Sequence, residues 1–194
     1  TGYDEIITEG RVTGLLRDGE IVSQAGTGDH LEIITNRSPF YAEAGGQLGD
    51  HGVIVTPDGA RAEVYDVQTP VPGLFVHRAR VTEGEFISGC DIVGMVDVER
   101  RRAISRAHTA THLVHRAFRQ LLGDTATQMG SENAPGRFRF DFPHSAAVPE
   151  SVLRDAEAIV NDVLSADLDV SARMMHIDQA RESGAMALFG EKYG

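Results

Sequence analysis

Short apolar runs separated by turn signals fill the first half of the chain. Asp18-Gly19 separates two such runs and Pro57-Asp58-Gly59 separates two more, and both signals are typical of β-hairpin turns. At least six strand candidates follow one another at short spacing, and no helical period interrupts them. Residues 1–97 are therefore predicted to form a small lobe, either a β-barrel or a β-sandwich.

The period of the apolar residues changes after this lobe. Apolar positions in residues 102–122 share one stripe of a helix, and a second amphipathic helix is predicted over residues 152–164. Between the two helices, residues 137–142 alternate aromatic and charged side chains, as a half-buried strand does. The predicted fold class is therefore α+β, with a mixed second segment over residues 98–194.

The end of the chain carries two further predictions. Residues 167–177 are interpreted as another strand. Asp178 is a candidate N-cap for a short third helix that extends to Leu188.

Composition and charge narrow the classes of function. Hydrophobic residues make up 41% of the 194 positions, which excludes a disordered chain. No apolar run reaches the roughly 18 residues that span a bilayer, so we expect a cytoplasmic protein with no membrane partner. The single cysteine, Cys90, excludes an internal disulfide framework and fits a reducing compartment. Because the first residue is Thr1 rather than Met, we expect a piece of a longer protein.

The formal net charge of -11 argues against binding nucleic acid by bulk positive charge. The charge is unevenly spread, however, because residues 99–119 contain six arginines and one acidic residue. Guanidinium groups match phosphate oxygens, so one interpretation is contact with a phosphorylated or nucleic-acid substrate. The alternative is an ordinary solvated helix face.

Three histidines share one face of the first predicted helix, namely His108, His112 and His115. A pair at i and i+4, such as His108 and His112, can hold one divalent ion, and zinc suits two imidazoles. The motif lacks the glutamate of the HExxH peptidases, because Thr109 stands at that position. Surface histidines, or histidines satisfied by hydrogen bonds, remain the alternative, since a catalytic zinc site usually has three protein ligands.

A glycine-rich segment at residues 44–49 lies between strand candidates. It is neither a Walker loop nor a dinucleotide fingerprint, because it lacks the Gly-Lys-Ser/Thr end and no helical pattern follows it. It is either a flexible turn or a place where the backbone closely approaches a ligand.

Four blocks together resemble the editing region of alanyl-tRNA synthetase and its free-standing relatives. They are residues 38–52, 106–123, 128–142 and 184–194, in the family's order over essentially the whole chain. The resemblance implies a β-barrel-like lobe followed by an α+β editing core of the kind shared with threonyl-tRNA synthetases. It also implies an aminoacyl-tRNA deacylase region of an ATP-dependent ligase, which hydrolyses Ser-tRNA(Ala) and Gly-tRNA(Ala).

The resemblance carries individual residues over. His108 and His112 match the family's first two zinc ligands, and Thr111 matches a position tied to discrimination against correctly charged alanine; these three are the candidate catalytic residues. The candidate substrate-binding residues comprise a pocket glutamine, two loop glycines, two strand aromatics and two arginines chosen by charge: Gln128, Gly45, Gly46, Phe138, Phe140, Arg102 and Arg106. The expected partners are the acceptor end of tRNA(Ala) and the other domains of the synthetase.

The family's remaining metal ligands lie in a Cys-x-x-x-His motif beyond residues 184–194, and this chain ends before such a motif. We therefore expect zinc in the complete domain, but weak or absent zinc binding and weak or lost hydrolysis for these 194 residues alone. The alternatives are a non-catalytic module that binds the tRNA acceptor end or a partner protein, and a free-standing trans-editing deacylase. A metal-dependent hydrolase of small esters is disfavoured by the absent HExxH glutamate and by the arginine cluster.

Overall fold

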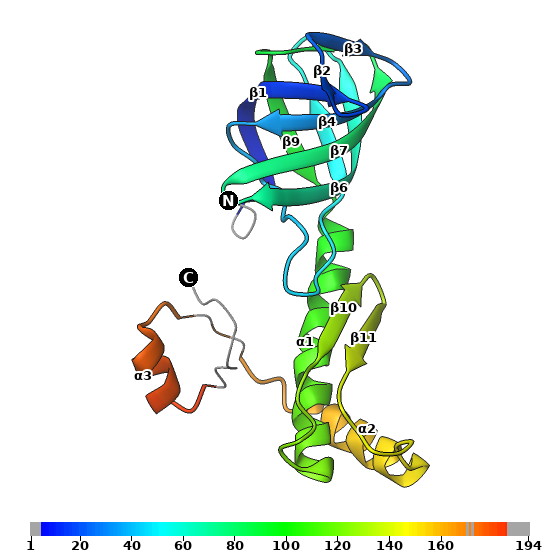
Figure 1. Cartoon of the computed structure of the whole chain (residues 1–194), viewed down its shortest axis with the longest axis vertical. Coiled ribbons are helices and arrows are strands. Elements are labelled where there is room, and N and C mark those ends of the chain that lie inside the picture. Colours follow the sequence, from blue (N-terminus) through cyan, green and yellow to red (C-terminus); the bar gives the residue numbers. More distant parts are fainter. Residues whose placement is uncertain (1–4, 170, 172, 186–194) are drawn as a thin grey trace. The chain divides into compact units, whose positions relative to one another are not determined.

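The computed structural model of the chain describes residues 5–169, 171 and 173–185 (Figure 1). The chain divides into two compact units, residues 1–160 and residues 161–194. The boundary predicted between residues 97 and 98 falls inside the first unit, where the last barrel strand meets the first helix. That residues 1–97 and 98–194 form two separate domains therefore stays a prediction.

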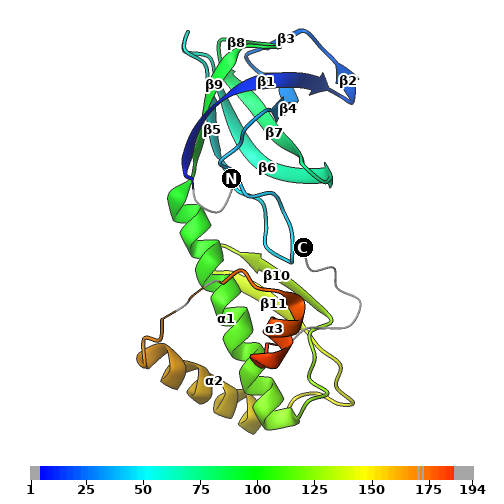
Figure 2. The same cartoon turned by 90° about the vertical axis from the view of Figure 1, so that its left-hand side faces the viewer.

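Six strands of the first unit close into an antiparallel barrel, because the last strand in the sheet also pairs with the first (Figure 2). Around the barrel they are β1 (Ile7–Arg17), β4 (His30–Thr35), β7 (Leu74–Glu83), β6 (Arg61–Val71), β5 (Gly52–Val55) and β9 (Asp91–Val96). β2 (Glu20–Ile21) pairs antiparallel with the end of β1, and β3 (Gln24–Gly26) pairs with β8 (Glu85–Ile87). The barrel confirms the predicted β-barrel-like lobe.

Alternation along these strands builds the barrel core. Side chains that point inward are fully buried and belong to one apolar cluster, which includes Val12, Leu15, Ile33, Val67, Val81 and Phe86. The turn between β1 and β2 places Asp18 at φ 54° and Gly19 at φ 82°. Two positive φ angles are what a two-residue type I′ hairpin requires, which explains why this turn could be predicted from its residues.

A long helix, α1 (Val98–Leu122), follows directly after the barrel. Its N-cap is Asp97, whose side chain accepts a hydrogen bond from the backbone N–H of Arg100 at 3.0 Å. The helix therefore starts before residue 102, where the apolar stripe alone placed its beginning. Gly123, at φ 90°, ends it, and its N–H donates to the carbonyl of Arg119 at 3.0 Å.

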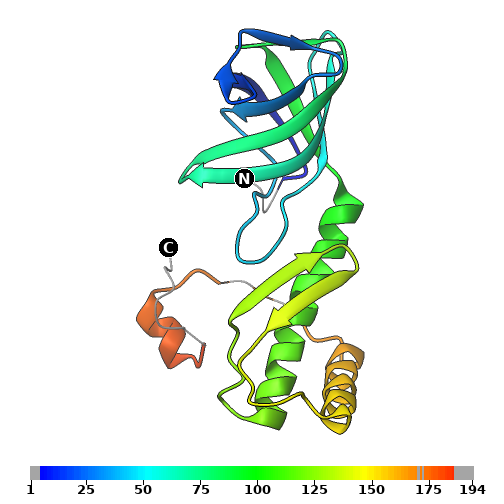
Figure 3. The same ribbon diagram turned by 45° about the vertical axis from the view of Figure 1, so that its right-hand side comes forward.

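A two-stranded hairpin packs along α1 (Figure 3). It consists of β10 (Gly130–Ala134) and β11 (Arg137–Asp141), and β11 confirms the strand predicted from aromatic alternation. The sequence did not predict β10, because GSENA has no alternation of apolar and polar residues. α2 (Glu150–Ser165) confirms the second amphipathic helix, and its Ala156 packs in an apolar cluster with Phe118 of α1.

The second unit contains α3 (Ile177–Glu182). The strand predicted over residues 167–177 is wrong, because the described residues of that segment form no strand. A strand needs a neighbour for its backbone hydrogen bonds, and no described strand supplies one there. The N-cap of α3 is His176, so Asp178 lies in its first turn and not at the cap. The third helix also ends earlier than predicted, and Leu188 lies outside the described residues, as does most of block 184–194.

Within the described residues, no helix is both long enough and apolar enough to cross a membrane.

Candidate functional site

The glycine-rich segment belongs to a loop, residues 36–51, that connects β4 to β5 and is anchored at its start by a buried histidine. The ring of His77, 1% exposed, is bonded through Nδ1 to the carbonyl of Ile33 at 2.8 Å and through Nε2 to Ser38 Oγ at 2.7 Å. Nδ1 must carry the proton to meet a carbonyl, so Nε2 accepts the hydrogen bond of the Ser38 hydroxyl. Burial lowers the pKa of His77 to about 4. This pair is a neutral structural anchor.

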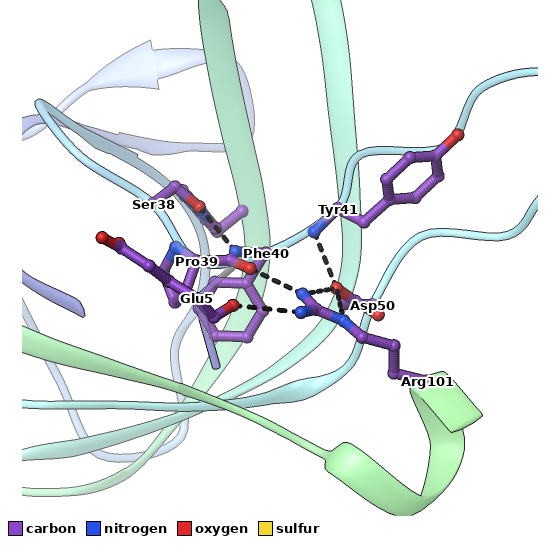
Figure 4. Close-up of polar contacts among 8 residues, drawn as sticks. Glu5, Ser38, Pro39, Phe40, Tyr41, Asp50 and Arg101 are labelled. Atoms are coloured by element: carbon purple, nitrogen blue, oxygen red, sulfur yellow. Dashed lines mark hydrogen bonds and ion pairs between the residues drawn. The ribbon is translucent and has the colours of Figure 1, made fainter. Parts of the chain in front are cut away.

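A buried ion pair anchors the other end of the same loop (Figure 4). Arg101, in the first turns of α1, donates to Asp50 Oδ2 from Nε at 3.0 Å and also from Nη2. Its guanidinium further donates to the carbonyl of Glu5 at 3.0 Å and to that of Pro39 at 2.6 Å. The backbone N–H of Tyr41 donates to Asp50 Oδ2 at 2.7 Å. Both ends of the loop are thus fixed, and one of them is tied to the helix that carries the histidines.

The tip of the loop lies against β10. The carbonyl of Gly46 accepts from the backbone N–H of Asn133 at 2.6 Å, and the N–H of Leu48 donates to the carbonyl of Asn133 at 3.2 Å. Gly46 has φ 77°, and a Cβ built on it would lie 2.3 Å from Ser131 Oγ. A side chain at this position therefore cannot be accommodated without moving the loop.

Gly45 and Gln128 lie beside this contact. Gly45 has φ 58° but faces open space, so only its backbone conformation favours glycine. Gln128 donates from Nε2 to Ser131 Oγ at 3.1 Å, and Ser131 is the residue that Gly46 approaches. The structure therefore places Gln128 and Gly46 against the same residue, Ser131, with Gly45 next to Gly46 in the loop.

His108 contacts the loop tip from α1. Its Nδ1 lies 2.9 Å from Gln47 Oε1, and because an amide oxygen only accepts, Nδ1 carries the proton and Nε2 keeps a free lone pair. The rings of His108 and His112 stack with centroids 5.0 Å apart and an interplanar angle of 22°. Burial lowers the pKa of His108, and the neighbouring His112 lowers it further. The neutral imidazole that results is the form that binds metal ions.

The two histidines fit zinc as part of a ligand set. A hydrogen bond from the other ring nitrogen, such as the one to Gln47, is the usual way in which proteins orient a metal-binding histidine. Zinc takes four ligands, and the described residues contain no group of three or more His, Cys, Asp or Glu side chains that could hold a metal. His108 and His112 thus supply at most two of the four positions.

Thr111 lies one helical turn from His108 and is buried, with 2% of its surface exposed. Its Oγ1 is 3.0 Å from the carbonyl of Ala107 and 2.6 Å from Asn133 Oδ1. A hydroxyl has one proton, so Thr111 donates to one of these two oxygens at a time. Through Asn133, Thr111 is connected to the same loop tip as His108.

The aromatic residues of β11 lie on the helix side of the hairpin. Phe138 is paired in register with Asn133, and Phe140 packs against His115 with ring centroids 5.1 Å apart. Burial lowers the pKa of His115, and Arg119 lowers it further. The third histidine of the helix face therefore serves packing against the hairpin, whereas His108 reaches the loop.

The structure does not bring the two candidate arginines to the loop tip. Arg102 is exposed and pairs with Glu99 at 3.1 Å, and Arg106 is also exposed. On an ideal helix Arg106 lies about 160° and Arg102 about 120° around the axis from His108. Their side chains therefore leave α1 on other faces than the histidine pair.

Comparison with known proteins places the chain in a family. Residues 1–100 match the family model described as tRNA synthetases class II (A). The chain belongs to this class II tRNA synthetase family. The match covers the barrel and the first turn of α1, and it ends before His108, the first histidine of the helix.

The relatives of this class II synthetase chain are alanine–tRNA ligases. The chain is 61% identical over 194 residues to the enzyme of Nocardioides sp., 57% identical to that of Acidothermus cellulolyticus and 54% identical to that of Kineococcus radiotolerans. Each match covers 100% of this chain and 22% of the relative. The chain therefore spans about a fifth of the length of the curated relatives it matches.

Two residues of this candidate site were not predicted from the sequence, namely Gln47 and Asn133. Gln47 stands beside the two loop glycines, and this position is the one signal that could have singled it out. Asn133 has no such signal, since it lies on a strand that the pattern did not predict.

Proposed function

We propose that this chain forms part of the editing site of an alanine–tRNA ligase, where the aminoacyl esters of Ser-tRNA(Ala) and Gly-tRNA(Ala) are hydrolysed. One observation carries the proposal: the glycine loop, His108 and the Thr111–Asn133 pair form one hydrogen-bonded group. The identity to alanine–tRNA ligases along the whole chain supports it. On this proposal, α1, the hairpin and the segment that follows are an editing core of the kind shared with threonyl-tRNA synthetases.

Hydrolysis of mischarged tRNA is needed because a binding pocket discriminates poorly between alanine and the similar amino acids glycine and serine. A synthetic pocket sized for alanine cannot exclude the smaller glycine by size. A hydrophobic pocket also rejects a substrate with one added hydroxyl only by about 10²-fold. A second, hydrolytic site is the general solution where binding alone cannot discriminate.

The residues of the chain have distinct tasks in this reaction. Hydrolysis of an ester needs an attacking water and stabilisation of the oxyanion that forms. Gly45 presents backbone without a side chain toward open space, which lets the aminoacyl group approach closely, whereas the missing side chain of Gly46 lets the loop pack against Ser131. Gln47 holds the Nδ1 proton of His108 and so orients its Nε2.

His108 and His112 are the residues that would hold zinc, together with ligands that the described residues do not include. When bound, zinc supplies Lewis-acid polarisation of the ester carbonyl or a water whose pKa is lowered to about 7. Burial lowers the pKa of His108, which favours the neutral ring that binding a metal ion requires.

The acceptor end of tRNA(Ala) is the proposed macromolecular partner, with the other domains of the ligase. Exposed guanidinium groups suit phosphate contacts, and Arg102 and Arg106 offer two of them on neighbouring turns of α1. Arg106 forms no ion pair with any residue that the structure describes, so its charge is available for such a contact.

The proposal is tested with the alanine–tRNA ligase of Nocardioides sp. in which the matching segment is replaced by this chain (the grafted ligase). The grafted ligase should hydrolyse Ser-tRNA(Ala) and Gly-tRNA(Ala) faster than Ala-tRNA(Ala). Replacing both histidines, His108→Ala with His112→Ala, should abolish this hydrolysis and leave aminoacylation with alanine unchanged. The control is His30→Ala, which removes an exposed histidine of the barrel.

Aminoacylation serves as the test that the grafted ligase is folded. A grafted ligase that charges tRNA(Ala) with alanine but hydrolyses neither mischarged tRNA would refute the deacylase function and favour a non-catalytic binding module. Hydrolysis that survives the double histidine replacement would refute the role given to the pair.

A further inference from the structure

Asn133 has a buried side chain that stability alone does not explain. It has no exposed surface, and its Oδ1 is 2.6 Å from Thr111 Oγ1. Its Nδ2 is also buried and has no hydrogen-bond partner among the described residues. A buried amide with an unpaired nitrogen is less favourable than an apolar side chain of similar size, so its presence calls for another reason.

The same residue joins two parts of the site. Its backbone holds the loop tip, with its N–H 2.6 Å from the carbonyl of Gly46 and its carbonyl 3.2 Å from the N–H of Leu48. Its side chain holds Thr111 of α1. Any movement of Asn133 therefore changes the position of the Thr111 hydroxyl relative to the glycine loop.

The contact also decides how Thr111 can interact with a ligand. The acceptors for its single proton are both protein atoms, and the oxygen of Asn133 is closer than the carbonyl of Ala107. With its proton engaged inside the protein, Oγ1 has only a lone pair left for other partners. A lone pair accepts from a seryl hydroxyl and has no counterpart on an alanyl side chain.

We propose that Asn133 is a positioning residue for substrate discrimination, which orients the Thr111 hydroxyl as an acceptor beside the glycine loop and thereby favours the seryl ester over the alanyl ester. This inference rests on the deacylase function proposed above. Asn133 acts through Thr111 and touches neither the ester nor a metal ion.

The first test is Asn133→Val in the grafted ligase. Valine keeps the backbone bonds to the loop and removes only the side-chain bond to Thr111. The ratio of kcat/KM for Ser-tRNA(Ala) to that for Ala-tRNA(Ala) should fall about threefold to tenfold, the effect of one lost hydrogen bond. Glu132→Gln, on the same strand but partly exposed and paired with Arg137, is the control and should leave the ratio unchanged.

A double-mutant cycle with Thr111→Val tests whether Asn133 acts through Thr111. The variant with both replacements should have the same Ser/Ala ratio as Thr111→Val alone, because the hydroxyl that Asn133 orients is already gone. Two apolar side chains that face each other leave no unpaired buried group from this contact, so the doubly replaced variant should fold even if Asn133→Val alone does not.

The outcomes separate the two proposals. If the unaltered grafted ligase hydrolyses neither mischarged tRNA, the deacylase function fails and the role of Asn133 fails with it. If it hydrolyses Ser-tRNA(Ala) but Asn133→Val leaves the ratio within about twofold, only the inference about Asn133 is overturned. The inference would also be overturned if the two replacements lowered the Ser/Ala ratio by independent factors, so that the double variant showed their product. Asn133 would then not act through Thr111.

Discussion

The ion pair between Arg101 and Asp50 makes the sharpest prediction about stability. The side chain of Arg101 is 15% exposed and that of Asp50 is 1% exposed (Figure 4). In an Arg101→Met variant, Asp50 Oδ2 keeps the N–H of Tyr41, while its Oδ1 already has no hydrogen-bond partner among the described residues. Removing one partner of a buried ion pair costs about 3–5 kcal/mol, because a charge is left buried and unpaired.

The neighbouring arginine supplies a matched control. Arg102 pairs with Glu99 on the surface, where the two side chains are 66% and 80% exposed. Arg102→Met, the same substitution one residue along, should therefore change the free energy of unfolding by no more than about 1 kcal/mol. Thermal unfolding of the chain, followed by circular dichroism, measures both variants. At about 2–4 °C per kcal/mol, Tm should fall by roughly 6–20 °C for Arg101→Met.

A third variant separates the unpaired charge from lost packing. Asp50→Asn in the Arg101→Met background removes the carboxylate charge at nearly constant shape, and it should recover at least half of the lost stability. Equal losses for Arg101→Met and Arg102→Met would refute the reasoning. A loss without recovery by Asp50→Asn would assign the effect to the lost contacts with backbone carbonyls.

Three further predictions concern the loop, its anchor and the histidine pair. Gly46→Ala should displace the loop and abolish deacylation in the grafted ligase, whereas Gly45→Ala should cost only about 1 kcal/mol for the positive φ and keep most of the activity, as unfolding and hydrolysis assays will show. For His77, whose pKa is lowered to about 4, the unfolded chain binds a proton between pH 6.5 and 4 that the folded chain does not, so the free energy of unfolding should fall by about 3 kcal/mol as pH drops through that range. Urea denaturation measures this component, and it should be absent in His77→Gln. For the 194 residues alone, metal analysis after dialysis should find well under one zinc ion per chain. The grafted ligase should lose zinc when His108 and His112 are replaced. Stoichiometric zinc in the isolated chain would contradict the incomplete ligand set.

Local patterns account for the features that the sequence predicted. The hairpin at Asp18-Gly19 depends on two adjacent residues that tolerate positive φ. The placement of His108 and His112 on one helix face depends only on their spacing and on the helical period. The barrel follows from many short alternating runs, and α2 follows from one continuous apolar stripe.

Contacts between distant segments account for most of what was missed. Gln47 and His108 are 61 positions apart in the sequence, and Thr111 and Asn133 are 22 apart, so no local pattern predicts either contact. Arg101 and Arg102 are adjacent residues of the same type, so the sequence does not distinguish them. Only the direction in which each side chain leaves the helix decides that Arg101 is buried and Arg102 is exposed. The segment 167–177 has residues that suit a strand, but among the residues that the structure describes no strand lies beside it for pairing.

Closure of the barrel has a consequence for how the protein is made. β1 completes the barrel by pairing with β9, and the paired residues Arg11 and Asp91 are 80 positions apart. During synthesis, the edge of β1 that pairs with β9 therefore stays unpaired until these residues have been added. At roughly 5–20 residues per second, this wait lasts about 4–16 s. Throughout that time the nascent chain exposes an unpaired strand edge, and such edges are prone to aggregation until they pair.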